Sequence, residues 1–139
     1  MAVHVLTVLA YKEGDPVTST FLATSVNTNP VVIRRLLLDL QRARLVETRK
    51  GVGFGSRLTR SPSRINLADI YDAVESDQPF TLPRSRPNQA CPVGHCIRAA
   101  LEKVFRSTEQ ALERELAKTT LTAVVGVVRS SCSNRSNTD

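Results

Sequence analysis

The spacing of apolar residues predicts three short helices within residues 1–75. Residues 1–11 form an apolar segment that ends at a turn containing glycine and proline. Residues 18–25 form a second helical segment, with hydroxyl side chains that can cap it. A further helix over residues 67–75 follows Asn66, a residue type that favours the N-cap position.

The clearest helical pattern begins at Asn29 or Pro30 and extends to about Ala43. Proline suits the first helical position because its missing N–H is not needed there. Apolar residues then follow at helical spacing, at Val32, Ile33, Leu36, Leu37 and Leu40. Only a few residues separate this helix from the one over 18–25, which is the arrangement of a helix-turn-helix.

The pattern changes after Ala43 to two short extended segments. Residues 45–49 and 56–60 predict two strands, and the glycine-rich residues 50–55 between them predict the tip of a β-hairpin. A hairpin that follows a helix-turn-helix is the wing of a winged helix. The sequence therefore predicts a mainly α fold with a small β-hairpin, in which residues 1–75 form a winged helix-turn-helix DNA-binding domain.

The rest of the chain predicts a linker and a long helix. Residues 76–90 contain three prolines and few apolar groups, which is typical of an extended linker. A helix from about Pro92 to Lys118 would span ~37 Å, more than the core of one small domain requires. We expect its apolar stripe to pair with the same helix of a second chain. Residues 91–125 would then hold a dimerisation helix and a short following helix. The polar tail, residues 126–139, is expected to be disordered. The residues expected at the dimer contact are Ile97, Leu101, Val104, Phe105, Leu112 and Leu116.

Charge narrows the choice of partner. The 139 residues carry a net charge of +6, and the stretch 18–60 alone carries an excess of +6, with Asp39 and Glu47 as its only acidic residues. A concentrated positive charge is typical of a surface that contacts phosphates, although a solvated basic face without a partner is the simpler alternative. With four Phe, two Tyr and no Trp, a stacking platform for single-stranded nucleic acid is disfavoured. No apolar run reaches the ~20 residues of a membrane span, and no secretory signal is evident, so we expect a cytoplasmic protein.

The helix that begins near Pro30 is the candidate recognition helix. Its first turns offer side chains that can contact base edges and phosphates: Thr28, Asn29, Val31, Val32, Arg34 and Arg35. The two arginines lie ~100° apart on a helix, so we expect one to enter the major groove of DNA and the other to contact a phosphate. In the wing, Gly51, Gly53 and Gly55 are regularly spaced but lack the context of a nucleotide-binding loop.

Cys91 and Cys96, with His95 between them, form the one cluster that suggests other chemistry. They could be incidental thiols, redox-sensing thiols near a helix start, or part of a metal site. A closed metal site needs four ligands, and the remaining cysteine, Cys132, lies in the tail. With two histidines in the chain, a catalytic triad is disfavoured, and we do not expect an enzyme.

Several runs together resemble the Rrf2 family of bacterial winged helix-turn-helix regulators, of the IscR, NsrR and CymR type. The resemblance rests on the run SVNTNPVVIRR (25–35), on Leu45-Val46 with the glycine-rich wing, and on residues 65–74. The Cys-Pro-Val-Gly start of the long helix (91–94) is similar to the YwnA-like branch, which has no iron–sulfur cluster. Cluster-binding members carry three cysteines near the long helix, whereas this chain has Cys91 and Cys96 there, so we expect no metal and no cofactor.

The resemblance implies a homodimer that binds a double-stranded DNA operator and represses transcription. The residues expected to contact DNA are Thr18, Ser19, Thr28, Asn29, Val31, Val32, Arg34, Arg35, Arg49, Lys50, Val52, Phe54, Ser56 and Arg57. Cys91 and Cys96 are candidates for sensing a redox or thiol-reactive signal. The alternatives are an iron–sulfur or metal-responsive regulator of the same family, a small thiol or metal enzyme, and a protein-interaction adaptor.

Overall fold

The computed structural model describes residues 1–75 and 79–135, so part of the expected linker (76–78) and the last four residues lie outside the described residues. The elements follow the predicted order closely. They are α1 (Ala2–Tyr11), α2 (Ser19–Val26), α3 (Pro30–Arg42), β1 (Val46–Thr48), β2 (Ser56–Leu58), the short 3-10 helix η1 (Pro62–Arg64), α4 (Leu67–Val74), α5 (Pro92–Ala117) and α6 (Leu121–Arg135).

Side-chain caps explain where α2 and α3 begin. The Thr18 side chain accepts a hydrogen bond from the Phe21 N–H, 3.2 Å away, at the start of α2. At the start of α3, Asn29 Oδ1 accepts from the Val31 N–H at 2.8 Å. These side chains satisfy N–H groups that have no partner inside the helix. The predicted helix starts are thus confirmed by the polar residues that the sequence places there.

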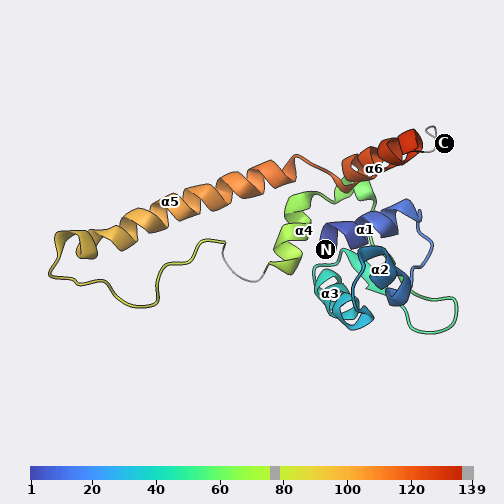
Figure 1. Ribbon diagram of the computed structural model, residues 1–139, viewed down its shortest axis with the longest axis horizontal. Helices are drawn as coiled ribbons and strands as arrows, with labels where there is room; N and C mark the ends of the chain where they lie inside the picture. The colour runs from blue at the N-terminus through green and yellow to red at the C-terminus, as the bar shows by residue number, and fades with distance from the viewer. Residues whose placement is uncertain (76–78, 136–139) are drawn as a thin grey trace.

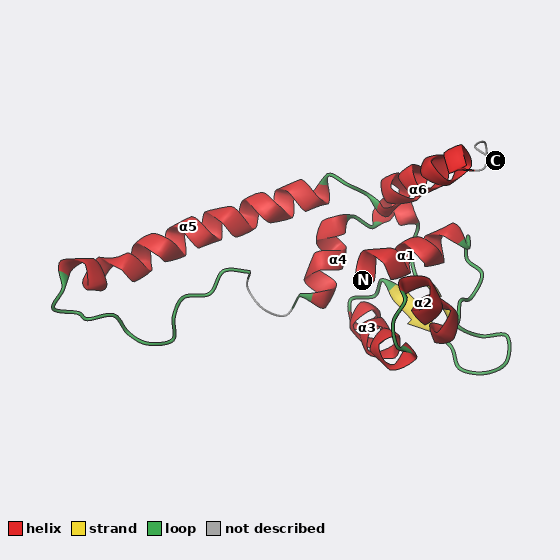
Figure 2. Cartoon of the chain, viewed as in Figure 1, coloured by secondary structure: helices red, strands yellow, loops and turns green. Residues whose placement is uncertain are grey.

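Helices α1, α2, α3 and α4, the hairpin and the start of α6 share one aliphatic core. Its fully buried side chains include Leu6, Leu22, Ile33 and Leu40. Figure 2 shows α1, α2 and α3 gathered around the two strands. Among the described residues no phenylalanine or tyrosine is buried. We call this part, residues 1–75 together with α6, the globular region.

The hairpin is antiparallel, with Glu47 opposite Arg57 and Thr48 opposite Ser56. A third stretch of backbone lies beside it, because the N–H and C=O of Val17 both bond to Ser56, at 2.9 and 2.8 Å. This approach requires glycine at position 55, where a Cβ would lie 2.6 Å from the Val17 carbonyl oxygen. The residue before α2 is therefore fixed to the base of the wing.

Helix α5 extends away from the globular region (Figure 1), and none of its side chains is buried. The preceding residues 79–90, here called the strap, return toward it: the Phe80 ring stacks on Phe105 with centroids 5.4 Å apart. The chain re-enters the globular region after α5. There the Leu67 N–H donates to the Thr119 carbonyl (3.0 Å) and the Leu121 N–H donates to the Ile65 carbonyl (2.8 Å).

Helix α6 corrects the expectation of a disordered tail from residue 126. The helix continues to Arg135, well past Val125, where the sequence pattern predicted the last ordered segment to end. Leu121 and Val125 are buried in the core, so the first turn of the helix is already fixed, and each further residue then adds to it at low cost. Arg129 also forms an ion pair with Glu13, which lies in the turn after α1. A polar sequence alone did not reveal this anchor.

The described helices include none that combines the length and apolar character of a membrane span.

Candidate nucleic-acid interface

Helix α3 presents a basic and partly apolar outer face. Ile33, Leu37 and Leu40 turn into the core, which leaves Arg34 and Arg35 exposed. Neither arginine forms an ion pair within residues 1–75 and 79–135. Val31 and Val32, at the start of the helix, are 56% and 43% exposed. Cations and methyl groups on one exposed helix face are suited to phosphates and to the edges of thymine.

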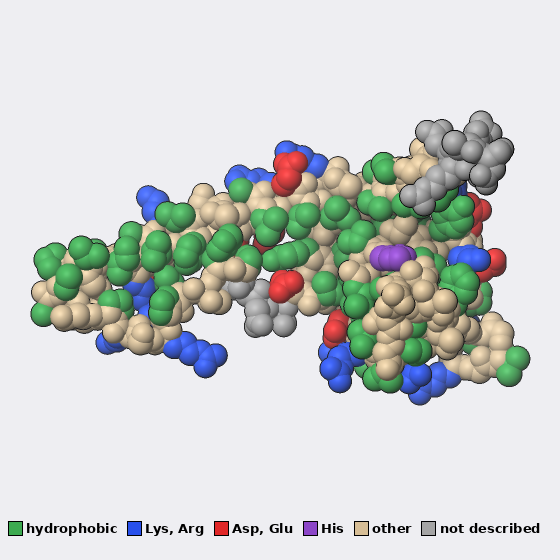
Figure 3. Space-filling view, viewed as in Figure 1, with side chains coloured by type: hydrophobic (Ala, Val, Ile, Leu, Met, Phe, Trp, Pro, Cys, Tyr) green, Lys and Arg blue, Asp and Glu red, His purple; other side chains and the backbone are tan. Residues whose placement is uncertain are grey.

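A groove of about 460 Å³ lies between α3, the start of α2 and the wing. Arg34, Arg49 and Lys50 bring three positive charges to it from two elements. Seven of the predicted DNA-contact residues line it: Thr18, Ser19, Arg34, Arg49, Lys50, Phe54 and Ser56. In Figure 3, Lys and Arg side chains lie along the lower edge of the globular region, on the side of α3. The groove thus combines hydrogen-bonding, apolar and cationic groups in one concave surface.

Arg34 and Arg35 lie on different sides of α3. Arg34 lines the groove, and Arg35 does not.

Ser56 is a correction to the predicted contacts. Its side chain is 1% exposed and shares a hydrogen bond of 2.8 Å with the Thr48 hydroxyl. Its backbone is paired with Val17 as well as with β1. The residue holds the base of the wing and cannot reach DNA, because the pairing of Val17 closes the outer side of β2.

Three other predicted contacts already have partners in the protein. The side chains of Thr18 and Asn29 cap α2 and α3, so their oxygens bond to backbone N–H groups. Arg57 forms an ion pair with Glu47 across the hairpin. Each remains exposed, but its main hydrogen bond is structural.

The remaining predicted contacts lie outside the groove. Thr28 is half-buried in the turn between α2 and α3, and Val52 is fully exposed at the wing tip. Gly51 and Gly53 on either side of Val52 have positive φ angles of 123° and 77°, a conformation that favours glycine. The tip is therefore a tight turn, as the spacing of the glycines predicted.

Five residues that line the groove were absent from the predicted contacts: Leu37, Leu38, Gln41, Thr48 and Gly55. Leu38 and Gln41 follow Arg34 by four and seven positions and so lie on the same face of α3. Leu38 is 54% exposed although it is apolar. Helical periodicity from Arg34 could have found both, but only the first turns of this helix were considered as contacts.

The predicted stripe on α5 divides into two parts. Ile97 and Val104 are 38% and 57% exposed, and Val93, one turn before Ile97, is 67% exposed. Phe105 is instead covered by Phe80 of the strap. Leu101, Leu112 and Leu116 are half-buried. Figure 3 shows an apolar band along the visible face of α5.

The cysteines lie at the far end of α5. Cys91 is the N-cap of the helix and Cys96 lies in its second turn, and both are exposed. Cys132 is exposed on α6, in a different part of the molecule. Within the described ranges 1–75 and 79–135, no three His, Cys, Asp or Glu side chains are grouped as a metal site would require.

Comparison with known proteins agrees with this geometry. The chain is 38% identical over 125 residues to YwnA of Bacillus subtilis (strain 168), which carries the name of an HTH-type transcriptional regulator; the match covers 90% of this chain and 92% of that protein. A crystal structure described as a DNA-binding protein has 36% identity and a TM-score of 0.71, covering 88% of this chain and 94% of the other. IscR of T. potens shares the fold at 21% identity, with a TM-score of 0.68 and coverage of 94% and 84%.

The Rrf2 family model, described as an iron-dependent transcriptional regulator, matches residues 1–126. This match covers the helix-turn-helix, the wing, α5 and the start of α6. The family and the relatives are regulators rather than enzymes. The chain therefore belongs to the Rrf2 family of DNA-binding transcriptional regulators.

Proposed function

We propose that the protein is a homodimeric repressor that acts on DNA in the cytoplasm and inserts α3 of each subunit into the major groove of an operator. The observation that carries the proposal is the groove in which Arg34, Arg49 and Lys50 converge from α3 and the wing. One DNA backbone would lie along this groove, with its phosphates at Arg49 and Lys50. Arg34 would reach from the groove to base edges, and Arg35, outside the groove, would contact a neighbouring phosphate.

The exposed stripe of α5 supports the homodimer. A helix of 26 residues with Val93, Ile97 and Val104 open to solvent leaves apolar surface that a second α5 would cover. Two recognition helices would then read half-sites one helical turn, about 10 base pairs, apart. Repression is the simplest consequence of such binding, because a dimer bound over a promoter would block the polymerase without any further surface.

The test begins with duplexes selected from a random pool by the purified protein. Fluorescence anisotropy with a selected duplex is expected to show affinity falling steeply as salt increases. Arg34→Ala should weaken binding by ~1–3 kcal/mol, whereas Arg114→Ala, on the distant α5, should leave it nearly unchanged. Failure to select any duplex at low salt with a folded protein would overturn the proposal.

Repression needs its own readout. In transcription with purified polymerase, a promoter that contains the selected duplex should lose transcript as the protein is added, and Arg34→Ala should require more protein for the same loss. An increase in transcript would identify an activator instead.

Iron does not fit the residues that this chain provides, although the family model is described as iron-dependent. Cys91 and Cys96 are two soft donors, and among the described residues they are not grouped with a third His, Cys, Asp or Glu in an arrangement that could hold a metal ion. No step of the proposed function therefore passes through iron. Purified protein is expected to be colourless and free of iron.

A thiol signal is the second candidate, favoured by the exposure of Cys91 and Cys96 at the start of α5. A thiolate would attack peroxide, form a sulfenic acid and release hydroxide, which places a polar group at the helix start. Peroxide should then release the selected duplex from the wild type but not from Cys91→Ser/Cys96→Ser. Cys132→Ser is the control, and equal release from all variants would exclude the sensor.

A further inference from the structure

A second concave site lies on the globular region, lined by residues other than those of the groove. It has a volume of about 430 Å³ and lies between α1, the end of the wing hairpin and α6. This volume is within the range of sites that bind small organic molecules. The lining residues are Leu9, Ala10, Glu13, Gly14, Leu58, Arg60, Pro62, Thr122, Val125 and Arg129.

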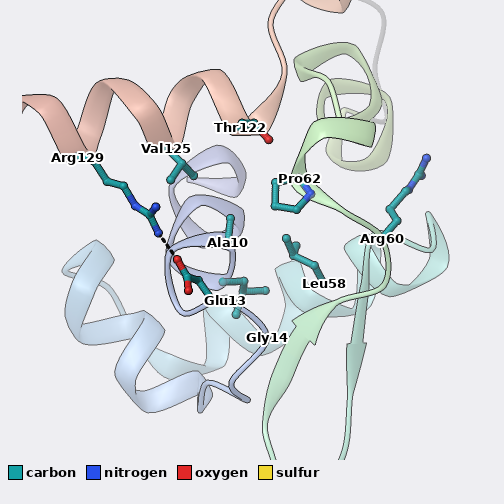
Figure 4. A pocket seen from close by; sticks show the side chains of 10 residues that line it. Ala10, Glu13, Gly14, Leu58, Arg60, Pro62, Thr122, Val125 and Arg129 are labelled. Atoms are coloured by element: carbon teal, nitrogen blue, oxygen red, sulfur yellow. Dashed lines mark hydrogen bonds and ion pairs between the residues drawn. The ribbon is translucent and has the colours of Figure 1, made fainter.

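One side of this pocket is apolar. Leu9, Ala10 and Val125 are buried members of the core, and Leu58 of β2 packs against it. Figure 4 shows Ala10, Val125 and Leu58 around the open space, with Pro62 closing one side. A small hydrocarbon or aromatic group would replace water against these side chains, which is favourable.

The other side carries an ion pair that a ligand can replace. Arg129 reaches from α6 to Glu13, with Nη2 2.6 Å from Oε1 (Figure 4). The two side chains are 49% and 73% exposed, and an ion pair of this kind contributes only ~0–1 kcal/mol. The guanidinium also lies 5.2 Å from the centre of the Tyr11 ring, which keeps it at the pocket when its carboxylate partner changes.

The charges of the lining favour an anion. Arg60 and Arg129 are opposed by Glu13 alone, which leaves a net charge of +1. Arg60 lies at the opposite rim and its guanidinium points away from the ion pair in Figure 4, so it adds positive potential rather than a contact. Arg129 uses one of its five N–H donors on Glu13, and a planar carboxylate is the group that can engage two at once.

We propose that this pocket binds a small monocarboxylate with an apolar tail, which exchanges with Glu13 for the Arg129 guanidinium. The tail would lie on Leu9, Leu58 and Val125. Because Leu58 belongs to the wing hairpin and Arg129 to the helix after α5, an occupant contacts both the DNA-reading and the α5-linked parts of the chain. Occupancy therefore changes the affinity for DNA, a second step that rests on the proposed function.

The first test measures the site alone and needs no DNA. Methyl signals of leucine and valine are followed by NMR while benzoate or hexanoate is added to the full chain at millimolar concentrations. Signals of Leu9, Leu58 and Val125 are expected to shift with benzoate, and much less with benzyl alcohol or benzylammonium. Absence of shifts with both carboxylates overturns the site.

Two substitutions separate the proposed chemistry from a general apolar effect. Arg129→Gln should weaken benzoate binding at least about tenfold, because a charged hydrogen bond is lost. Glu13→Gln should tighten it, because the competing carboxylate is removed. Arg106→Gln on α5 is the matched control and should bind benzoate like the wild type. Unchanged affinity in Arg129→Gln, or weaker binding in Glu13→Gln, overturns the exchange.

The second test measures the affinity of the protein for the selected duplex, with and without benzoate. The affinity of the wild type for the duplex should change at least about threefold, and that of Arg129→Gln should not. If no duplex binds at all, the proposed function fails while the NMR shifts still decide the site. If the duplex binds equally well with the pocket saturated, the regulatory step is wrong.

Discussion

Helices α3 and α5 carry the two longest apolar patterns after residue 29, but only α3 buries its apolar side chains. Helix α3 has 13 residues and buries Ile33, Leu37 and Leu40, whereas α5 has twice that length and buries none. Both helices start with proline and carry apolar residues at helical spacing. The difference is that α3 has α2, α4 and β1 beside it, and α5 has α4 and the strap. An apolar stripe therefore indicates that a helix packs against something, but it does not indicate whether the partner is the same chain or a second one.

The comparison also locates where stability arises. Burial of aliphatic side chains is the main favourable term in folding, so the globular region can account for its own stability. Helix α5 gains little from its own chain and, under the proposal, gains the rest from a second copy. The following predictions test this division, from the largest expected effect to the smallest.

The largest effect is expected from Leu40→Ala in α3. Leu40 is fully buried, so the free energy of unfolding should fall by ~2–5 kcal/mol through lost burial and a cavity. Leu38→Ala is the matched control on the same helix, because Leu38 is 54% exposed, and it should change stability by less than ~0.5 kcal/mol. Urea denaturation followed by circular dichroism measures both. Equal losses would mean that α3 is not packed as described.

On α5 the effect should appear in association rather than in folding. Val104→Glu places a carboxylate in the middle of the exposed stripe and should weaken the proposed dimer by ~100-fold or more. Sedimentation equilibrium measures the dimer, and circular dichroism should show unchanged helix content in the globular region.

Gln110→Glu adds the same charge to another face of α5 and is the matched control. It should leave the dimer nearly intact. A wild-type protein that stays monomeric at high concentration would contradict the comparison, because the stripe would then have no partner.

A smaller effect is expected from removing an asparagine side chain that accepts a hydrogen bond from a backbone N–H, once in the globular region and once in the strap. Asn66 Oδ1 accepts from the Asp69 N–H (2.9 Å), and Asp69 Oδ2 accepts from the Asn66 N–H (3.0 Å), at the start of α4. Asn66→Ala should cost ~1 kcal/mol of unfolding free energy. In the strap, Asn88 Oδ1 accepts from the Ala90 N–H at 3.0 Å. Asn88→Ala should leave the unfolding free energy within ~0.5 kcal/mol, and a larger loss there than at Asn66 would show that the strap belongs to the cooperative core.

The smallest effect concerns Tyr71, where α4 meets α5. Partial burial, followed by the carboxylates of Glu75, Glu109, Asp72 and Glu113, raises the pKa of its phenol above the ordinary value of 10.0. The unfolded chain then ionises at lower pH than the folded chain. This contribution to stability is complete below pH 10 and is lost as the pH rises through the folded-state pKa.

An absorbance titration of the tyrosinate band measures that pKa, with Tyr71→Phe identifying the signal. Glu113→Gln should lower the pKa of Tyr71, because it removes a negative charge that α5 supplies. Glu115→Gln, two residues along α5, is the control and should have little effect. No change in Glu113→Gln would indicate that α5 does not lie against α4 in solution.

The sequence predicted the local structure well because the determining interactions are local. Thr18, Asn29 and Asn66 are side chains that cap the next few N–H groups, so their position alone fixes a helix start. The glycines of the wing and the change from helical to alternating spacing after Ala43 gave the hairpin in the same way. The recognition face of α3 followed from periodicity, since Ile33, Leu37 and Leu40 face inward and Arg34 cannot.

The candidate site was only partly predictable. Ser56 was expected at the DNA surface because it lies in the wing, but Val17, distant in sequence, covers it. Leu38 was left out of the predicted contacts and lies in the groove. Both errors have the same cause: exposure depends on segments that are far apart along the chain.

What the sequence by itself determined is therefore the order, type and limits of nearly all elements, and the family to which the chain belongs. Only the tertiary structure decided that α6 continues to Arg135, that Phe80 covers Phe105, and that Glu13 meets Arg129. Caps, turns and helical spacing act over a few residues, so a sequence displays them directly. The pairing of Glu13 with Arg129 spans 116 positions, and a contact of that range is fixed by how the whole core packs.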